Sequence, residues 1–188
     1  MANKTNFWAI FVVPWSPKNR YRFALYVLVG TYLIFVLTWL VNYFASGQVP
    51  SVPLWWLFFP IGISAFLMLI FWIIGLLVEN TGKKLPEGAQ LRSHCMVVHG
   101  LLEAPGVVQI SSDHLVIQPF MCRQISVALS DIAAVTEYHY YNGRPYLGKT
   151  VFFKLKVPRT VSDKWRLGFG VEDGDRWRKV LLAKSNTT

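Results

Sequence analysis

No aspartate, glutamate, lysine, arginine or histidine occurs between Phe23 and Val78. This absence excludes the proton relays, ion pathways and intramembrane substrate sites that depend on ionisable side chains. All ten acidic residues and fifteen of the nineteen lysines and arginines follow this stretch. The chain of 188 residues therefore divides into an apolar part that ends near residue 80 and a polar part large enough for one small domain.

Cysteine and catalytic motifs are scarce as well. Cys95 and Cys122 are the only two cysteines, which gives no disulfide framework. His94, Cys95 and His99 are close in sequence but lack the paired ligand spacing of a closed zinc site. A Gly-x-Ser-x-Gly elbow, a catalytic cysteine motif and a glycine-rich phosphate loop are missing. We therefore expect no metal, no cofactor, no small-molecule substrate and no enzymatic activity; an enzyme with an unrecognised site is the third interpretation.

The formal net charge of +9 would suggest nucleic acid in a soluble protein. The sequence contains no basic helix and no RNA-binding motif, which argues against that partner. Next to apolar helices, the positive charge is better explained by the anionic inner face of a bilayer. We expect the lipid bilayer, rather than nucleic acid, to be a partner.

Two hydrophobic runs are long enough to cross a bilayer, whose ~30 Å core requires about 20 apolar residues. The first runs from Phe23 to Tyr43. We place the start of the second at Pro60, because proline suits the first turn of a helix, and its end at Val78. The preceding Leu54 to Phe59 then forms an aromatic belt at the far interface, and the uncharged residues 45–53 form a short translocated loop.

Positive charge flanks both runs on the same side. The flanking residues are Lys18, Arg20, Arg22, Lys83, Lys84 and Arg92. Since such charge stays in the cytoplasm, both termini are predicted to be cytoplasmic, in an integral protein of the bacterial inner membrane. A signal peptide cleaved at residues 45–47 is the competing interpretation, but the apolar run is about twice the usual length and a second run follows.

The N-terminal residues 1–22 contain a short apolar segment, Phe7 to Trp15. It is too short to cross a bilayer and too apolar to remain in water. It lies at the membrane interface, on a partner, or against its own helical hairpin. Trp8 and Trp15 are our candidates for protein contact in this segment.

After a predicted linker, residues 81–92, the hydrophobic period changes to two, which indicates β-strands. In Val151 to Val157, alternate apolar residues share one face, and Lys164 to Val171 repeats the pattern. Further strands are predicted at Val107–Ile110, His114–Pro119, Gln124–Leu129 and Ala134–Tyr141. Asp173 as N-cap and the helical spacing of Trp177, Val180, Leu181 and Lys184 predict a C-terminal helix with an apolar stripe.

The run His99 to Pro119 resembles the opening hairpin of GRAM and bacterial pleckstrin-homology-like (PH-like) domains. Val127 to Val135 is similar to the segment in which that family places a strand, a short polar step and an isoleucine before the next strand. The resemblance covers about residues 95–184 and implies a PH-like barrel or sandwich over residues 93–188 that acts as a binding module. Lipid-binding members carry basic residues around the first hairpin, whereas this chain has residues 111–114, Ser-Ser-Asp-His, at that place.

A set of basic residues is the first candidate binding surface. Lys154, Lys156, Lys164 and Arg166 are expected on the outer faces of two adjacent strands, with Arg159 in their connecting turn. Because like charges on neighbouring strands repel one another, the patch indicates contact with an anionic bilayer surface. An ordinary solvated strand face is the alternative.

A tyrosine-rich turn is the second candidate surface. It contains Tyr138, Tyr140, Tyr141 and Tyr146 around an Asn142-Gly143 turn. Tyrosine offers a large contact area with a polar end, which favours protein contact. A hairpin tip with partly buried rings is the alternative.

The sequence thus predicts a two-helix transmembrane hairpin, residues 23–80, and a cytoplasmic PH-like β-barrel or sandwich closed by a C-terminal helix. The predicted function is that of a membrane-anchored binding or scaffolding protein that engages a protein partner or the anionic inner leaflet. The alternative is a small accessory or assembly subunit of a larger complex with other membrane proteins or further copies of this chain.

Overall fold

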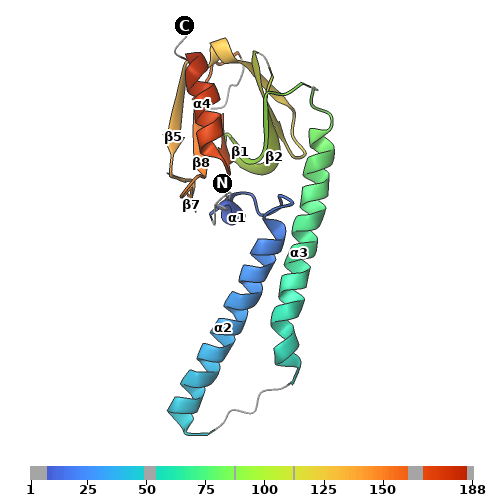
Figure 1. The fold of residues 1–188 in the computed structure, drawn as a ribbon, viewed down its shortest axis with the longest axis vertical. Coiled ribbons are helices and arrows are strands. Elements are labelled where there is room, and N and C mark those ends of the chain that lie inside the picture. The colour runs from blue at the N-terminus through green and yellow to red at the C-terminus, as the bar shows by residue number, and fades with distance from the viewer. Residues whose placement is uncertain (1–7, 49–53, 87, 112, 161–166, 186–188) are drawn as a thin grey trace, which may run out of the picture.

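The computed structural model describes residues 8–48, 54–86, 88–111, 113–160 and 167–185 (Figure 1). Two long antiparallel helices, α2 (Arg20–Ser46) and α3 (Leu54–Gly82), extend from a curled antiparallel sheet. A C-terminal helix, α4 (Gly174–Ser185), packs on the concave face of that sheet. The helical hairpin and the β-rich unit with a terminal helix agree with the sequence prediction.

The helices α2 and α3 are long and apolar enough to cross a bilayer. Ala24 is the only buried residue of α2, and large apolar side chains such as Ile34 and Phe44 are exposed. Gly47, with a φ of 68°, ends α2 in the left-handed conformation that a glycine adopts without steric cost. The predicted first run is therefore a helix, extended by three residues at each end.

The start of α3 differs from the prediction. The helix begins at Leu54, so Pro60 lies inside it rather than in the first turn. Proline has no N–H, and the carbonyl of Trp56 therefore loses its usual helical donor. Tertiary packing supports the upstream turns, because the ring of Trp56 lies 5.8 Å from the ring of Phe35 on α2.

The sheet has the strand order β4-β3-β2-β1-β9-β8-β5, and the paired strands are antiparallel. Its strands are β1 (Leu91–His99), β2 (Leu102–Ser111), β3 (His114–Pro119), β4 (Ile125–Ala128), β5 (Ala134–Tyr138), β8 (Val151–Lys156) and β9 (Leu167–Val171). A short 3-10 helix, η1 (Leu129–Asp131), connects β4 to β5, and a separate hairpin consists of β6 (Tyr140–Tyr141) and β7 (Arg144–Pro145).

Strand bounds were predicted well where the pattern alternates and less well elsewhere. The bounds of β3 match the prediction, and β2 begins five residues early. The strand β1 is absent from the prediction and begins inside the predicted linker. These additional residues pair with each other from Leu91 opposite Ile110 to His99 opposite Leu102. The predicted strand 134–141 is divided between β5 and β6, and residues 164–166 lie outside the described part of the chain.

The concave face of the sheet carries the main core. The predicted apolar stripe of α4 is confirmed at Trp177 and Leu181, which are buried, and at Val180, which packs against them. The ring of Trp177 meets that of Phe169 edge-on at 5.2 Å, and its indole N–H donates to Oγ of Ser93 at 3.0 Å. The amphipathic helix thus covers the open side of the curled sheet.

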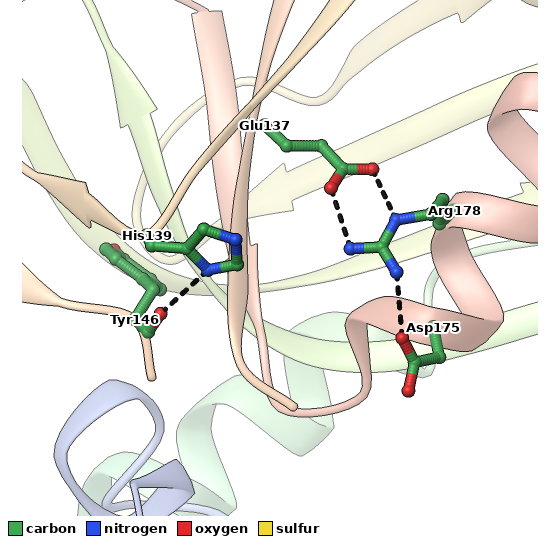
Figure 2. A network of polar contacts seen from close by, with 5 residues as sticks. All are labelled: Glu137, His139, Tyr146, Asp175 and Arg178. Atoms are coloured by element: carbon green, nitrogen blue, oxygen red, sulfur yellow. Dashed lines mark hydrogen bonds and ion pairs between the residues drawn. The ribbon is translucent and has the colours of Figure 1, made fainter. Parts of the chain in front are cut away.

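A polar contact joins α4 to the edge strand β5. Nε and Nη2 of Arg178 donate to the two carboxylate oxygens of Glu137 at 2.7 Å each, and Nη1 donates to Asp175 (Figure 2). The same figure shows His139 beside Tyr146, 3.2 Å from its carbonyl oxygen. Since a carbonyl only accepts, Nδ1 of His139 carries the proton. These contacts orient β5 and the start of the β6–β7 hairpin.

The convex face of the sheet carries a second core. We call residues 8–19, which include the short helix α1 (Ala9–Val12), the N-terminal strap. The strap, the last turns of α3 and the convex face share one buried cluster. Its members are Val12, Val13, Trp15, Val78, Leu85, Met96, Val98, Val107, Val116, Tyr146 and Phe152. The apolar N-terminal segment therefore packs between the helices and the sheet, which combines burial against its own hairpin with burial against the domain.

Two glycines of β9 make room for this second core. A Cβ at Gly170 would lie 2.3 Å from Cε1 of Tyr146, and one at Gly168 would lie 2.7 Å from Cζ of Phe152. Both glycines are opposite convex-face positions of β8, at Lys154 and Phe152. The absence of side chains on this face of β9 allows the aromatic rings to lie across the strand.

We expect Trp177→Ala to lower the free energy of unfolding by about 3 to 5 kcal/mol, because it removes a fully buried ring from the concave core. Thermal or denaturant unfolding of the full chain in mild detergent measures this. Leu101→Ala, at an 85 % exposed side chain, is the control and should change stability by no more than about 0.5 kcal/mol. Equal stability of the two variants would show that α4 does not close the sheet.

Candidate functional site at the helix–sheet junction

The N-terminal strap is fastened by Asn19, the residue before α2. Its buried side-chain amide donates to the carbonyl oxygens of Ala9 and Val13, each at 3.2 Å, and to Oε2 of Glu172 at 3.0 Å. One amide thus joins both ends of the strap to the segment between β9 and α4. The strap, the start of α2 and the sheet are held in one arrangement.

The strap also meets α3 at very short range. A Cβ added to Gly75 would lie 2.7 Å from the carbonyl oxygen of Trp15, closer than real side chains approach. Nη1 of Arg20 would lie 3.7 Å from the same added Cβ. Only glycine therefore lets the strap backbone reach the helix at this point.

A pocket lies where α3 meets the sheet. It has a volume of about 420 Å³ and is lined by Glu79, Lys83, Arg92, Ser93, His94 and Val107. This volume is within the range of small-ligand sites, roughly 300 to 1,000 Å³. The pocket exists because α3 continues to Gly82, the chain turns back through buried Leu85, and β1 then begins at Leu91 beside β2.

Two cations and one acid dominate the charge of the pocket. Arg92 lies over the last residue of α3, because a Cβ at Gly82 would be 2.4 Å from its Nη2. Lys83 is exposed and follows Gly82 directly. Within the described part of the chain neither cation forms an ion pair. Glu79 is the acid, so the formal charge of these three groups is +1.

His94 is a partly buried titratable group that lines the junction pocket. Burial lowers its pKa from the usual value, with a smaller contribution from Arg92, while Glu79 and Glu172 act in the opposite direction. Its Nε2 is buried and has no hydrogen-bond partner in the described structure. The ring is therefore neutral at pH 7.

Two further buried groups have shifted pKa values, and both are inert for the same reason. Burial raises the pKa of the Cys95 thiol, so this cysteine on the concave side remains protonated. Burial also raises the pKa of Tyr146, whose ring belongs to the convex core. Neither environment activates a nucleophile or a base.

His94, Cys95 and His99 are close in sequence, but their side chains do not come together in the structure. His94 and Cys95 are adjacent on β1 and point to opposite faces of the sheet, and His99 lies at the far end of that strand. Among the residues that the structure describes, no cluster of three histidine, cysteine or acidic side chains has the geometry to hold a metal ion.

The predicted basic patch is only partly described. Lys154 is half-buried, Lys156 and Arg159 are exposed, and Lys164 and Arg166 lie outside the described residues. The end of β8 at Lys156 pairs with Ala134 next to η1. Figure 1 shows η1, in gold, at the end of the sheet domain farthest from α2. A common surface of these five residues stays a prediction.

The tyrosine-rich turn needs a correction. The Asn142-Gly143 turn is present, with φ angles of 52° and 78°, but Tyr146 is only 1 % exposed and cannot belong to a contact surface. Tyr141 is half-buried and stacks on Phe152 at 4.0 Å. The hairpin folds back over the convex face because Gly168 and Gly170 leave space there.

The outcome for the remaining contact candidates is mixed. Tyr138 is half-buried against Tyr141, whereas Tyr140 is 66 % exposed. In the strap, Trp8 is half-buried beside Phe11, but Trp15 is 4 % exposed and packs in the convex core. Trp15 is therefore excluded as a partner contact, because its ring is buried by packing within the chain.

Sequence reasoning did not identify the junction pocket. The sequence identifies Lys83 and Arg92 only as positive flanks of the second run, and His94 only as a residue without the spacing of a metal site. These residues converge only because the last turn of α3 docks beside β1 and β2. No spacing pattern in the sequence predicts the contact between the last turn of α3 and the sheet.

Comparisons with known proteins do not identify the chain. No protein-family model and no curated protein matches the sequence. A similar solved structure is the crystal structure of the C-terminal domain of an unknown protein from Leishmania infantum. It is 13 % identical, covers 60 % of this chain and 97 % of that chain, and has a TM-score of 0.41.

We expect Gly75→Ala to detach the N-terminal strap from α3, because the new methyl group overlaps the carbonyl oxygen of Trp15. Such overpacking typically costs about 1 to 3 kcal/mol. Thermal unfolding and protease sensitivity of the strap in the full chain measure the effect. Gly62→Ala is the matched control on the same helix, because its Cβ meets nothing within 4 Å and should be neutral or slightly stabilising. The same response from both variants would contradict the close contact.

We expect the protein to lose stability as the pH falls below about 6.5, the ordinary pKa of histidine, and to retain full stability above it. The folded state holds His94 with a lowered pKa, so the unfolded state binds the proton first and is favoured in acid. The melting temperature between pH 7.5 and 5 should fall less in His94→Gln. His114→Gln, at an exposed histidine, should behave like the unchanged protein.

Proposed function

We propose that the chain is a membrane-anchored binding or scaffolding protein. In this proposal α2 and α3 cross the bilayer and hold the sheet domain at its cytoplasmic surface. The observation that carries it is the exposed surface of the two helices, which is apolar along its length. Large exposed side chains on it include Leu33, Ile34, Leu37, Phe44, Phe58 and Phe66.

This exposed surface requires an apolar environment. Soluble monomers rarely expose contiguous apolar patches of more than a few hundred Å². Within the described part of α2 and α3, nothing else in the chain covers these side chains (Figure 1). Lipid satisfies them, and the uncharged span from Phe23 to Val78 matches the requirement that no charge enters the hydrocarbon.

The second support is the rigid attachment of the sheet domain. The convex core, the Asn19 amide and the Gly75 contact join the domain to the helices in one orientation. A domain held in this way presents the same face at the bilayer at all times, which suits a scaffold better than a freely moving tether. The PH-like resemblance, which implies a binding module, favours the same function, with exposed Tyr140 as one available protein contact.

The second candidate is a small accessory subunit within a larger membrane complex. Gly30 on α2 and Gly62 on α3 favour it, because a Cβ at either position meets nothing within 4 Å. Small residues on an open helix face let another helix approach closely. Identification of proteins that co-purify in mild detergent, together with the mass of the complex, separates this candidate from the first.

We expect a cysteine introduced at Ser46, in a chain with Cys122→Ser, to react from outside intact bacterial spheroplasts with a membrane-impermeant thiol reagent. A cysteine at Lys84 in the same background should react only after permeabilisation. Cys95 is buried and adds little background. Reaction of both positions from the same side would show that the hairpin does not cross the bilayer.

A further inference from the structure

The junction pocket lies immediately beyond the exposed apolar surface of α3. Leu76 and Leu77 are the last large apolar side chains exposed on that helix. Glu79 and Lys83 follow Leu77 by two and six residues, which places them about 3 and 9 Å farther along the axis at 1.5 Å per residue. The headgroup layer of a bilayer is about 5 to 7 Å thick on each side. If α3 crosses a bilayer as proposed above, Glu79 lies in the headgroup layer and Lys83 just outside it, where the long lysine side chain can reach back to a phosphate.

The charge of the pocket suits a phosphate with one negative charge. Arg92 and Lys83 supply guanidinium and ammonium donors, and neither forms an ion pair within the described residues. Charge-assisted hydrogen bonds of this type are the strong ones, and arginine is especially suited to phosphate. Glu79 leaves a formal charge of +1, which opposes a headgroup with several phosphates.

Arg92 is an exposed side chain that lies against the end of α3. Arg92 lies over Gly82, and Val107 on β2 forms the apolar wall beside it. The guanidinium position is therefore set by the end of α3 and by the pairing of β1 with β2.

We propose that this pocket binds the phosphodiester of a bilayer phospholipid through Lys83 and Arg92. The proposal rests on the membrane-anchored function and adds a ligand to it. It also assigns lipid recognition to the side of the domain on which α3 ends, whereas the predicted patch on β8 ends next to η1 (Figure 1).

The test uses the full chain in an uncharged maltoside detergent and native mass spectrometry. Three probes are titrated: phosphatidylglycerol, diacylglycerol with the same acyl chains, and soluble glycerol phosphate. We expect one phosphatidylglycerol to bind, diacylglycerol to bind at least about tenfold more weakly, and glycerol phosphate not to compete, because it lacks the chains that lie beside α3.

Four variants locate the site. Lys83→Gln and Arg92→Gln should each weaken phosphatidylglycerol binding by about tenfold. Lys84→Gln is the matched control, because this neighbouring exposed lysine does not line the pocket and should change binding less than about twofold. Glu79→Gln should strengthen binding by about threefold or more, a gain that misfolding does not produce.

Three outcomes overturn the proposal. An equal loss in Lys84→Gln would indicate general charge attraction. Competition by glycerol phosphate would assign the pocket to a soluble phosphate instead of a lipid. Unchanged phosphatidylglycerol binding in Lys83→Gln, together with no gain in Glu79→Gln, would show that the lipid does not bind in this pocket. Alkaline extraction of the same protein from membranes separates this failure from that of the proposed function. If the chain stays in the membrane while the pocket variants bind lipid normally, only the proposed lipid site is wrong, and the membrane-anchored function stands.

Discussion

The sheet of this protein is apolar on both faces, and the need to cover the convex face determines how the rest of the chain is arranged. A half-buried sheet would leave that face to water, with α4 covering the concave side alone. Here Met96, Val98, Val107 and Phe152 point to the convex side and are buried. The strap and the last turns of α3 supply the missing layer, so the domain and the helices share one core.

Close approach of backbone is the condition for this shared core. Gly75 admits the carbonyl of Trp15, and Gly168 and Gly170 admit the rings of Phe152 and Tyr146. Asn19 then adds a second donor to the carbonyls of Ala9 and Val13, which also accept from the backbone N–H groups of Val13 and Ser16. The junction pocket is a consequence of the same docking, because its lining comes from α3 on one side and from β1 and β2 on the other. The proposed function and the proposed lipid site therefore depend on one packing arrangement.

The distribution of charge follows the same geometry. Two of the basic residues that flank the apolar runs lie against α3: Arg20 is close to Gly75, and Arg92 lies over Gly82. The acids there are engaged differently: Glu172 accepts from Asn19, whereas Glu79 lines the pocket. Two permanent cations thus remain available at the level where the exposed apolar surface of α3 ends. This position, more than the total charge of the chain, is the basis of the lipid site proposed above.

The sequence by itself determined the elements whose signals are local. An uncharged run longer than a bilayer is thick indicates a long apolar helix, the alternation in Val151 to Val157 indicates a strand, and the spacing of Trp177 and Leu181 indicates an amphipathic helix. Tertiary structure alone decided the start of α3 before Pro60, the full length of β1 and β2, the burial of Trp15 and Tyr146, and the junction pocket. Each of these depends on a partner far away in the chain, and hydrophobic periodicity reports which face of an element is buried without reporting what buries it.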